Sequence, residues 1–200
     1  MNAKLQWLRN KMLSLNLQGL IISNPVNIKY LTNIEAEGVL LLTRKDNIYI
    51  TDARYIEQVH TTLTLLDEII VYDIHDLSKE DYENFFMFCE NVGFEENYIS
   101  YATYKDYIRK YKINNFVETE HIIEKQRMIK DDEELENIKK ACEITDNCFK
   151  YIISYIKPGM TERQIANEIE DYYKQRADGL AFDTIVASRR KFIKATCSSN

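Results

Sequence analysis

Residues 127–135 read RMIKDDEEL and open the part of the chain that carries the strongest structural signals. Asp131 or Asp132 can cap a helix there, and the glutamates that follow place negative charge in its first turn, where the helix dipole favours it. Downstream, a mostly apolar stripe recurs at three- and four-residue spacing: Leu135, Ile138, Cys142, Thr145, Phe149, Ile152 and Ile156. This spacing predicts one long amphipathic helix.

Residues 157–162 read KPGMTE and predict the end of that helix and the start of another. Proline and glycine stop the first helix, while Thr161 and Gln164 form a capping box for a second helix that runs through Tyr173. Residues 177–188 then read ADGLAFDTIVAS, in which residues 182–186 alternate enough to predict a strand. A strand without neighbours would leave backbone donors and acceptors unpaired along both edges.

The first half of the chain alternates short apolar runs with amphipathic segments. Six runs predict strands, at residues 19–22, 39–43, 48–51, 69–72, 98–101 and 116–118. Helices are expected before the first run, after Asn24 and its following proline, and after Ser78, the last of these closing near Gly93. Strands that alternate with helices, together with one hairpin, predict an α/β domain with a mixed sheet flanked by helices.

Two further segments resemble a known family when they are taken with the stretches quoted above. Residues 27–32 read NIKYLT and residues 50–55 read ITDARY. In this order the segments are similar to Xaa-Pro aminopeptidases and Xaa-Pro dipeptidases (prolidases), which are relatives of creatinase. The resemblance implies a creatinase-type N-terminal domain over residues 1–124 and the two helices and first strand of an incomplete α+β pita-bread peptidase domain over residues 125–188. Residues 189–200 depart from the family pattern.

The resemblance also implies a dinuclear metal centre in a complete family member, with manganese as the expected ion. The family holds the two metals with two aspartates, one histidine and two glutamates, all of which follow the strand that residues 182–188 resemble. The twelve residues after Ser188 contain no Asp, Glu or His, and His60, His75 and His121 are scattered through the first half. We therefore expect no catalytic and no metal-binding residue in this chain, and no cofactor.

Residues 33–37 are the best candidates for contact with a substrate. In dimeric relatives the corresponding loop lies over the active site of the partner subunit, so that Asn33, Glu35 and Glu37 could meet the amino group of a peptide. The alternative is a solvated acidic loop. Asp52 and Arg54 could likewise grip a charged ligand, but a helix cap at Asp52 and an ion pair at Arg54 are the favoured interpretation.

Composition limits the remaining possibilities. The formal net charge of −6 argues against a general nucleic-acid binder, and no apolar run reaches the roughly 18 residues that a membrane span needs. The four cysteines form no CxxC pair and no regular framework, and the first residues lack an apolar signal, so a cytoplasmic protein is expected.

Two functional hypotheses follow from these observations. The first is a truncated Xaa-Pro aminopeptidase or dipeptidase-like protein, inactive as written, with proline-containing peptides as the family substrate and a homodimer formed through the N-terminal domain. The second is a non-catalytic dimerisation or peptide-binding module derived from the same fold. The sequence leaves open whether the chain is a fragment, the product of a frameshift or a functional truncation.

Overall fold

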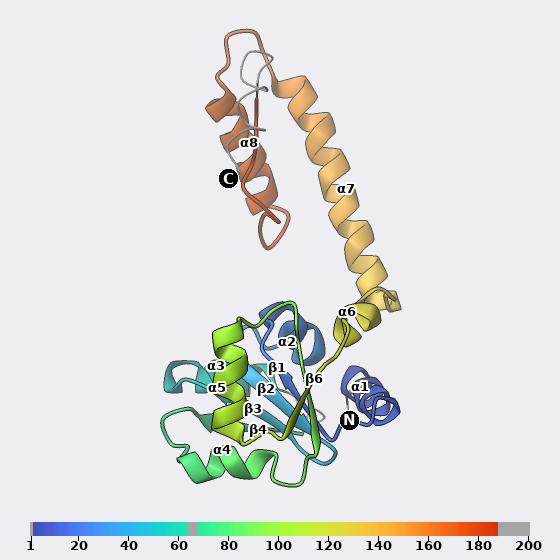
Figure 1. Ribbon diagram of the computed structural model, residues 1–200. Helices are drawn as coiled ribbons and strands as arrows, with labels where there is room; N and C mark the ends of the chain where they lie inside the picture. Colours follow the sequence, from blue (N-terminus) through green and yellow to red (C-terminus); the bar gives the residue numbers. More distant parts are fainter. Residues whose placement is uncertain (1, 64–67, 188–200) are drawn as a thin grey trace. The chain divides into compact units, whose positions relative to one another are not determined.

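The computed structural model describes residues 2–63 and 68–187, and the chain divides into two compact units (Figure 1). Unit 1 is Met1–Ile129 and unit 2 is Lys130–Asn200. The tail expected at residues 189–200 lies outside the described residues. No described helix has both the length and the apolar composition that crossing a membrane requires.

Unit 1 contains one six-stranded mixed sheet. Its strands are β1 (Gly19–Ile22), β2 (Gly38–Thr43), β3 (Asn47–Thr51), β4 (Ile69–Asp73), β5 (Asn91–Phe94) and β6 (Asn115–Glu118). They are arranged in the order β4-β3-β2-β1-β5-β6. Strand β2 pairs antiparallel with both β1 and β3, whereas the pairs β3–β4, β1–β5 and β5–β6 are parallel. Five strands therefore run in one direction and β2 alone runs against them.

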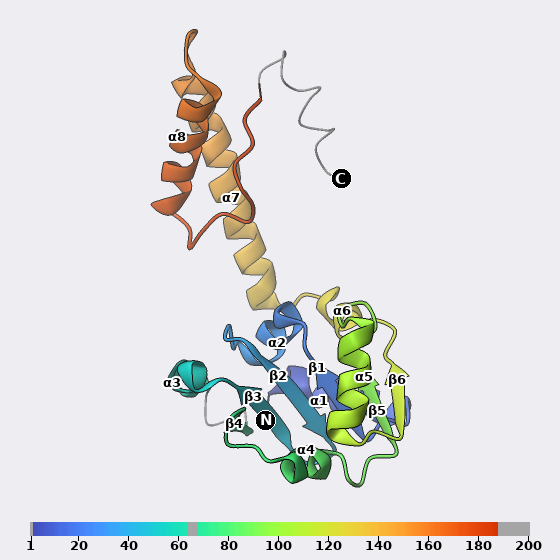
Figure 2. The same ribbon diagram turned by 60° about the vertical axis from the view of Figure 1, so that its left-hand side comes forward.

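Helices cover both faces of this sheet (Figure 2). They are α1 (Ala3–Ser14), α2 (Pro25–Thr32), α3 (Ala53–Thr62), α4 (Lys79–Phe85), α5 (Tyr101–Tyr111) and α6 (Ile122–Arg127). Residues of α1, α2, α3 and α6 share one core cluster with β1, β2 and β3, and residues of α4 and α5 pack into a second cluster. The sheet is thus the middle of three layers, and the predicted α/β class is confirmed.

Alternation along the strands explains how one sheet supports two cores. In β2, Leu40 and Leu42 enter the first cluster and Leu41 enters the second, and in β3 Tyr49 faces the first cluster while Ile48 faces the second. Successive side chains of a strand point to opposite faces. Because both faces are covered by helices, the strands read as apolar runs rather than as alternating patterns.

One predicted strand was misplaced. Residues 98–101 form no strand, since α5 begins at Tyr101 and is capped by Ser100, whose side chain accepts from the Thr103 amide. The strand is β5, and Gly93 lies inside it instead of ending a helix. A Cβ on Gly93 would lie 2.7 Å from a methyl carbon of Thr119 and 2.9 Å from one of Leu20, so close packing requires a glycine here.

Unit 2 contains the two predicted helices, α7 (Asp132–Tyr155) and α8 (Glu162–Lys174). Asp131 caps α7 in a capping box with Glu134, and Thr161 caps α8 in a capping box with Gln164, as the sequence predicts. Most of the predicted apolar stripe of α7 is nevertheless exposed; the Phe149 side chain is 67% exposed, and the only buried residues of α7 are Cys148 and Ile152.

The strand expected at residues 182–186 is not formed. The described residues of unit 2 contain no strand at all, and a strand exists only through its ladder of bonds to a neighbour. The predicted strand of the pita-bread domain is therefore wrong, whereas its two predicted helices are present. The segment after the helices is irregular.

Candidate functional site

The topology of unit 1 brings the candidate residues to one edge of the sheet. Because β2 alone is antiparallel, the carboxyl ends of the other five strands and the start of β2 all lie at this edge. Ligands of open α/β sheets bind outside the carboxyl ends of the strands. The loop at residues 33–37, which joins α2 to β2, belongs to this edge.

The loop is held by buried residues while its polar side chains face solvent. Burial alternates along it, so that Asn33, Glu35 and Glu37 are exposed whereas Ile34 and Ala36 are buried. Asn33 ends α2 in the left-handed conformation, with a φ of 60°. The sequence candidates are therefore presented together on one rigid loop, and Glu35 forms an ion pair with Lys29 of α2.

Two side chains of β3 fix the loop backbone. The buried Tyr49 hydroxyl donates to the Ala36 carbonyl at 2.7 Å, and the Thr51 hydroxyl donates to the Glu37 carbonyl at 2.5 Å. Burial raises the pKa of Tyr49 to about 12, which keeps the phenol protonated as a donor at neutral pH. The side chains of Asn33, Glu35 and Glu37 are exposed to solvent, with Glu35 paired to Lys29.

Asp52 and Arg54 lie at the same edge, where β3 ends. The Asp52 carboxylate caps α3 by accepting from the Arg54 amide at 3.0 Å, and it also accepts from the Arg54 Nε at 2.8 Å. Hydrogen bonds from Arg54, with a weaker one from His75, lower the pKa of Asp52 to about 2. The capping role is thus what the structure shows, and Arg54 pairs with the capping residue itself.

A buried polar network next to the loop was missed by the sequence analysis. The Glu95 carboxylate, at the end of β5, accepts from the backbone amides of Ser23 at 2.7 Å and Asn24 at 2.8 Å, and from the Asn27 side-chain amide at 2.6 Å. Burial raises the pKa of Glu95, and these hydrogen bonds oppose the rise. The nearest sequence signal is a glutamate directly after a strand.

The same Asn27 side chain reaches α6. Its Nδ2 also donates to Glu124 Oε1 at 2.6 Å, and its Oδ1 accepts from Arg127 Nη1 at 3.0 Å. A hollow of about 60 Å³ lies beside these groups and is lined by residues 95–98 and 121–124, Asn24 and Thr119. Its size suits water and not a peptide.

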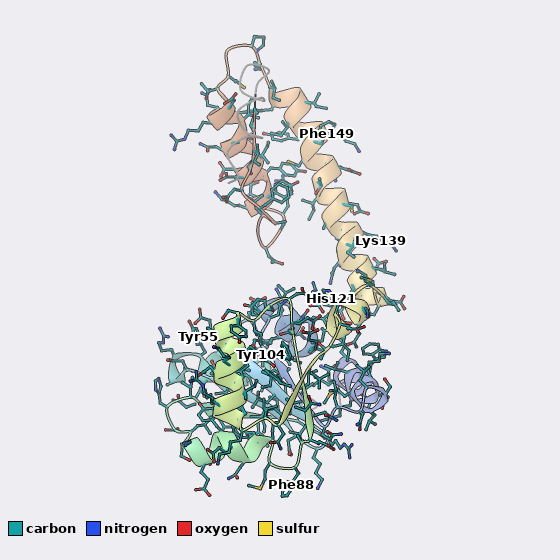
Figure 3. All side chains as sticks on the ribbon, viewed as in Figure 1. Tyr55, Phe88, Tyr104, His121, Lys139 and Phe149 are labelled. Carbon is teal, nitrogen blue, oxygen red and sulfur yellow. The ribbon has the colours of Figure 1, made fainter. Side chains whose placement is uncertain are left out.

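The three histidines do not come together at one site. His121, labelled in Figure 3, lies at the start of α6. Its Nε2 is 3.1 Å from Asn97 Nδ2, whereas His60 is in α3 and His75 is beside Asp52. Within residues 2–63 and 68–187, no three His, Cys, Asp or Glu side chains are grouped so that they could hold a metal ion. The residues described therefore do not fit a dinuclear metal centre.

Replacing Glu95 with glutamine tests the network. A glutamine can keep one oxygen for the amides of Ser23 and Asn24, but its NH₂ group would face the NH₂ group of Asn27, so one buried donor loses its partner. We expect the free energy of unfolding of unit 1 to fall by about 1 kcal/mol. Urea unfolding followed at Trp7, the only tryptophan, measures the change; exposed Glu90→Gln is the matched control and should be neutral.

Comparison with known proteins matches both units to described families. Residues 4–129 match the Creatinase/Prolidase N-terminal domain, and residues 136–195 match Metallopeptidase family M24. Among curated relatives, the uncharacterized peptidase YqhT of Bacillus subtilis (strain 168) is 33% identical over 189 residues, covering 92% of this chain and 53% of the relative. The uncharacterized peptidase SAB1567 of Staphylococcus aureus (strain bovine RF122 / ET3-1) is 30% identical over 176 residues, covering 82% and 48%.

Solved structures give the same result. The Xaa-Pro dipeptidase from Bacillus anthracis superposes with a TM-score of 0.80 at 29% identity, covering 92% of this chain and 52% of that one. The prolidase from Pyrococcus horikoshii OT3 gives a TM-score of 0.79 at 26% identity, covering 94% and 53%. The chain thus spans about half the length of the relatives that it matches.

Proposed function

Because this chain belongs to the Creatinase/Prolidase N-terminal domain family, we propose that it is the N-terminal part of a Xaa-Pro peptidase-like protein whose hydrolytic residues are not among these 200. The match over residues 4–129 carries this proposal. The domain boundaries that we propose are residues 1–124 for the creatinase-like domain and residues 125–188 for the peptidase-domain part. The family match extends to residue 195, into the segment 189–200 that was expected to depart from the family pattern.

In the complete protein, the loop at residues 33–37 is proposed to lie over the active site of a partner subunit. Its Glu35 and Glu37 carboxylates would then receive the amino group of a proline-containing peptide, and Asn33 would add a neutral hydrogen-bonding group. The exposure of these three side chains on a firmly anchored loop supports this role. Ion pairing at such a loop selects orientation more than it adds affinity.

Two divalent metals, proposed to be manganese, would supply the activated water in a complete family member. The residues described here offer no set of ligands for them. We therefore assign no catalytic and no metal-binding residue to this chain, and we propose that it does not hydrolyse peptides by itself.

Incubation of the purified chain with Xaa-Pro dipeptides and Mn²⁺ tests the inactivity. The expected result is no turnover above the no-protein control, because the described residues offer no ligands for the metals. For comparison, a prolidase of ordinary activity would turn over at about 1–10³ s⁻¹. Equilibrium dialysis against Mn²⁺ is the second readout, with no tight binding expected. Stoichiometric binding of two manganese ions, or turnover in the range given, would contradict the proposal.

A second candidate function is a non-catalytic module that dimerises or binds peptides. A groove of about 1,030 Å³ in unit 2 favours it, since the lining includes Ala141, Ile144, Leu180, Phe182 and Ile185. Light scattering after size exclusion separates the two candidates. A dimer whose mass does not change with concentration, together with a cooperative melt of both units, supports the module, whereas a melt confined to unit 1 supports the partial peptidase.

The cytoplasm is the compartment that we propose for this protein. The described cysteines Cys89, Cys142 and Cys148 are free thiols, as is usual where glutathione keeps thiols reduced.

A further inference from the structure

Asn27 is the point at which three parts of unit 1 are joined. Its side chain is fully buried and lies in the first turns of α2. The two hydrogens of its amide serve Glu95 at the end of β5 and Glu124 of α6, and its oxygen accepts from Arg127. The amide is therefore nearly saturated, and no other orientation of the group can satisfy both carboxylates and the guanidinium.

These bonds determine where α2 lies at the carboxyl edge of the sheet. Glu95 also accepts from the amide of Asn24, which is the N-cap of α2, and from the amide of Ser23 just before it. The start of the helix is thus tied to β5, and the side of the helix is tied to α6. The other end of α2 is Asn33, the first residue of the candidate loop.

We propose that Asn27 is the positioning residue of the loop at residues 33–37, fixing the direction in which α2 delivers that loop to the carboxyl edge. The importance of the loop rests on the function proposed above, whereas the positioning is a property of this chain alone. Asn27 and Arg127 come from two of the segments that resemble the family. Their hydrogen bond joins these two segments, which are distant in the sequence, at one point of unit 1.

Residue-resolved amide hydrogen exchange by NMR tests the positioning. The reporters are the amides of Asn33, which donates to the Lys29 carbonyl at 2.8 Å, and Ile34, which donates to Thr32 Oγ1 at 3.1 Å. In Asn27→Ala we expect both amides to accelerate about tenfold more than Leu41 in the middle of the sheet, because Leu41 reports only the loss of global stability whereas the loop amides also report local opening.

Two further variants keep the experiment decisive. Val26→Ala alters an exposed residue of the same helix and should leave the exchange of Asn33 and Ile34 unchanged. If Asn27→Ala does not fold, Arg127→Met removes the donor to the Asn27 oxygen and keeps the Asn27 amide beside Glu95 and Glu124, and acceleration greater in the loop than at Leu41 is again expected.

The proposal is overturned if a folded network variant leaves Asn33 and Ile34 unchanged, or if Leu41 accelerates by the same factor as the loop. The second outcome would show that Asn27 acts only on global stability. Neither metal nor substrate enters the measurement, so a failure here leaves the peptidase proposal standing. Absence of activity in a completed protein would leave the positioning result standing.

Discussion

Gly38→Ala should lower the free energy of unfolding of unit 1 by about 2 to 3 kcal/mol, as expected for overpacking a close-packed core. A Cβ at this position would lie 2.5 Å from Cζ of Tyr49 and 2.7 Å from the Ile50 carbonyl oxygen. The Tyr49 ring is fully buried, and the carbonyl belongs to the neighbouring strand, so neither can move away without disturbing the sheet. Urea unfolding followed by Trp7 fluorescence measures the loss.

Gly179→Ala is the matched control for this substitution. A Cβ on Gly179 meets no atom within 4 Å, so the same chemical change should be neutral or slightly stabilising. Combining Gly38→Ala with Tyr49→Phe should not restore stability, because the ring carbon and the Ile50 carbonyl both remain. A Gly38→Ala protein within about 0.5 kcal/mol of wild type, the range of ordinary surface changes, would show that the sheet relaxes more easily than its packing suggests.

Local signals in the sequence were sufficient to predict most elements. Thr161 and Gln164 are three residues apart, so a capping box can be read without any knowledge of the fold, and the structure forms it. Asn24 before a proline likewise marks the start of α2, which the structure confirms. Such predictions succeed because the interacting groups are neighbours along the chain.

The misplaced strand shows where this reasoning stops. The sequence of β5 is NVGF, and its glycine suggested the end of a helix. What makes glycine suitable in a strand there is the approach of Thr119 and Leu20, which come from distant parts of the chain. The prediction of a strand at residues 182–186 was wrong for a related reason. A strand forms only by hydrogen bonding to a neighbouring strand, and an apolar pattern does not show whether that neighbour is present.

The candidate edge was predictable in part. The pattern of residues 33–37 identified the acidic loop, but its anchors, Tyr49 and Thr51, follow only from the antiparallel pairing of β2 with β3. The Asn27–Glu95 and Asn27–Arg127 bonds join residues 68 and 100 positions apart. A buried carboxylate of this kind becomes visible only when the fold places its donors around it.

Two sets of contacts, one at each end, hold the loop at residues 33–37 in place. Asn27 and Glu95 fix the helix that leads into it, whereas Tyr49 and Gly38 fix the backbone where it enters β2. The acidic side chains between these two anchors are exposed, and Glu35 forms an ion pair with Lys29. A scaffold that holds charged groups at the carboxyl edge while leaving them exposed is suited to recognition and not to core stability.

Tyr49→Phe should show a loss of stability that depends on pH. At neutral pH the variant lacks the donor to the Ala36 carbonyl, and we expect it to unfold about 1.5 kcal/mol more easily than wild type. The phenol has a pKa of about 12 in the folded protein against 10.0 for an ordinary tyrosine. A raised pKa means that the contribution of Tyr49 is complete below pH 10 and is lost as the pH rises toward 12.

Because this contribution is lost at high pH, the stability of wild type plotted against pH should cross that of Tyr49→Phe. Two pKa units correspond to about 3 kcal/mol, so wild type should lose its advantage over Tyr49→Phe at about pH 11 and be the less stable protein above it. The other tyrosines of unit 1 whose pKa is raised, Tyr82, Tyr107 and Tyr111, titrate in both proteins and cancel in the difference. Urea midpoints taken from the Trp7 emission wavelength between pH 8 and pH 12 measure the difference. If the midpoints of the two proteins change in parallel with pH, the buried, hydrogen-bonded phenol of Tyr49 is not the anchor of the loop.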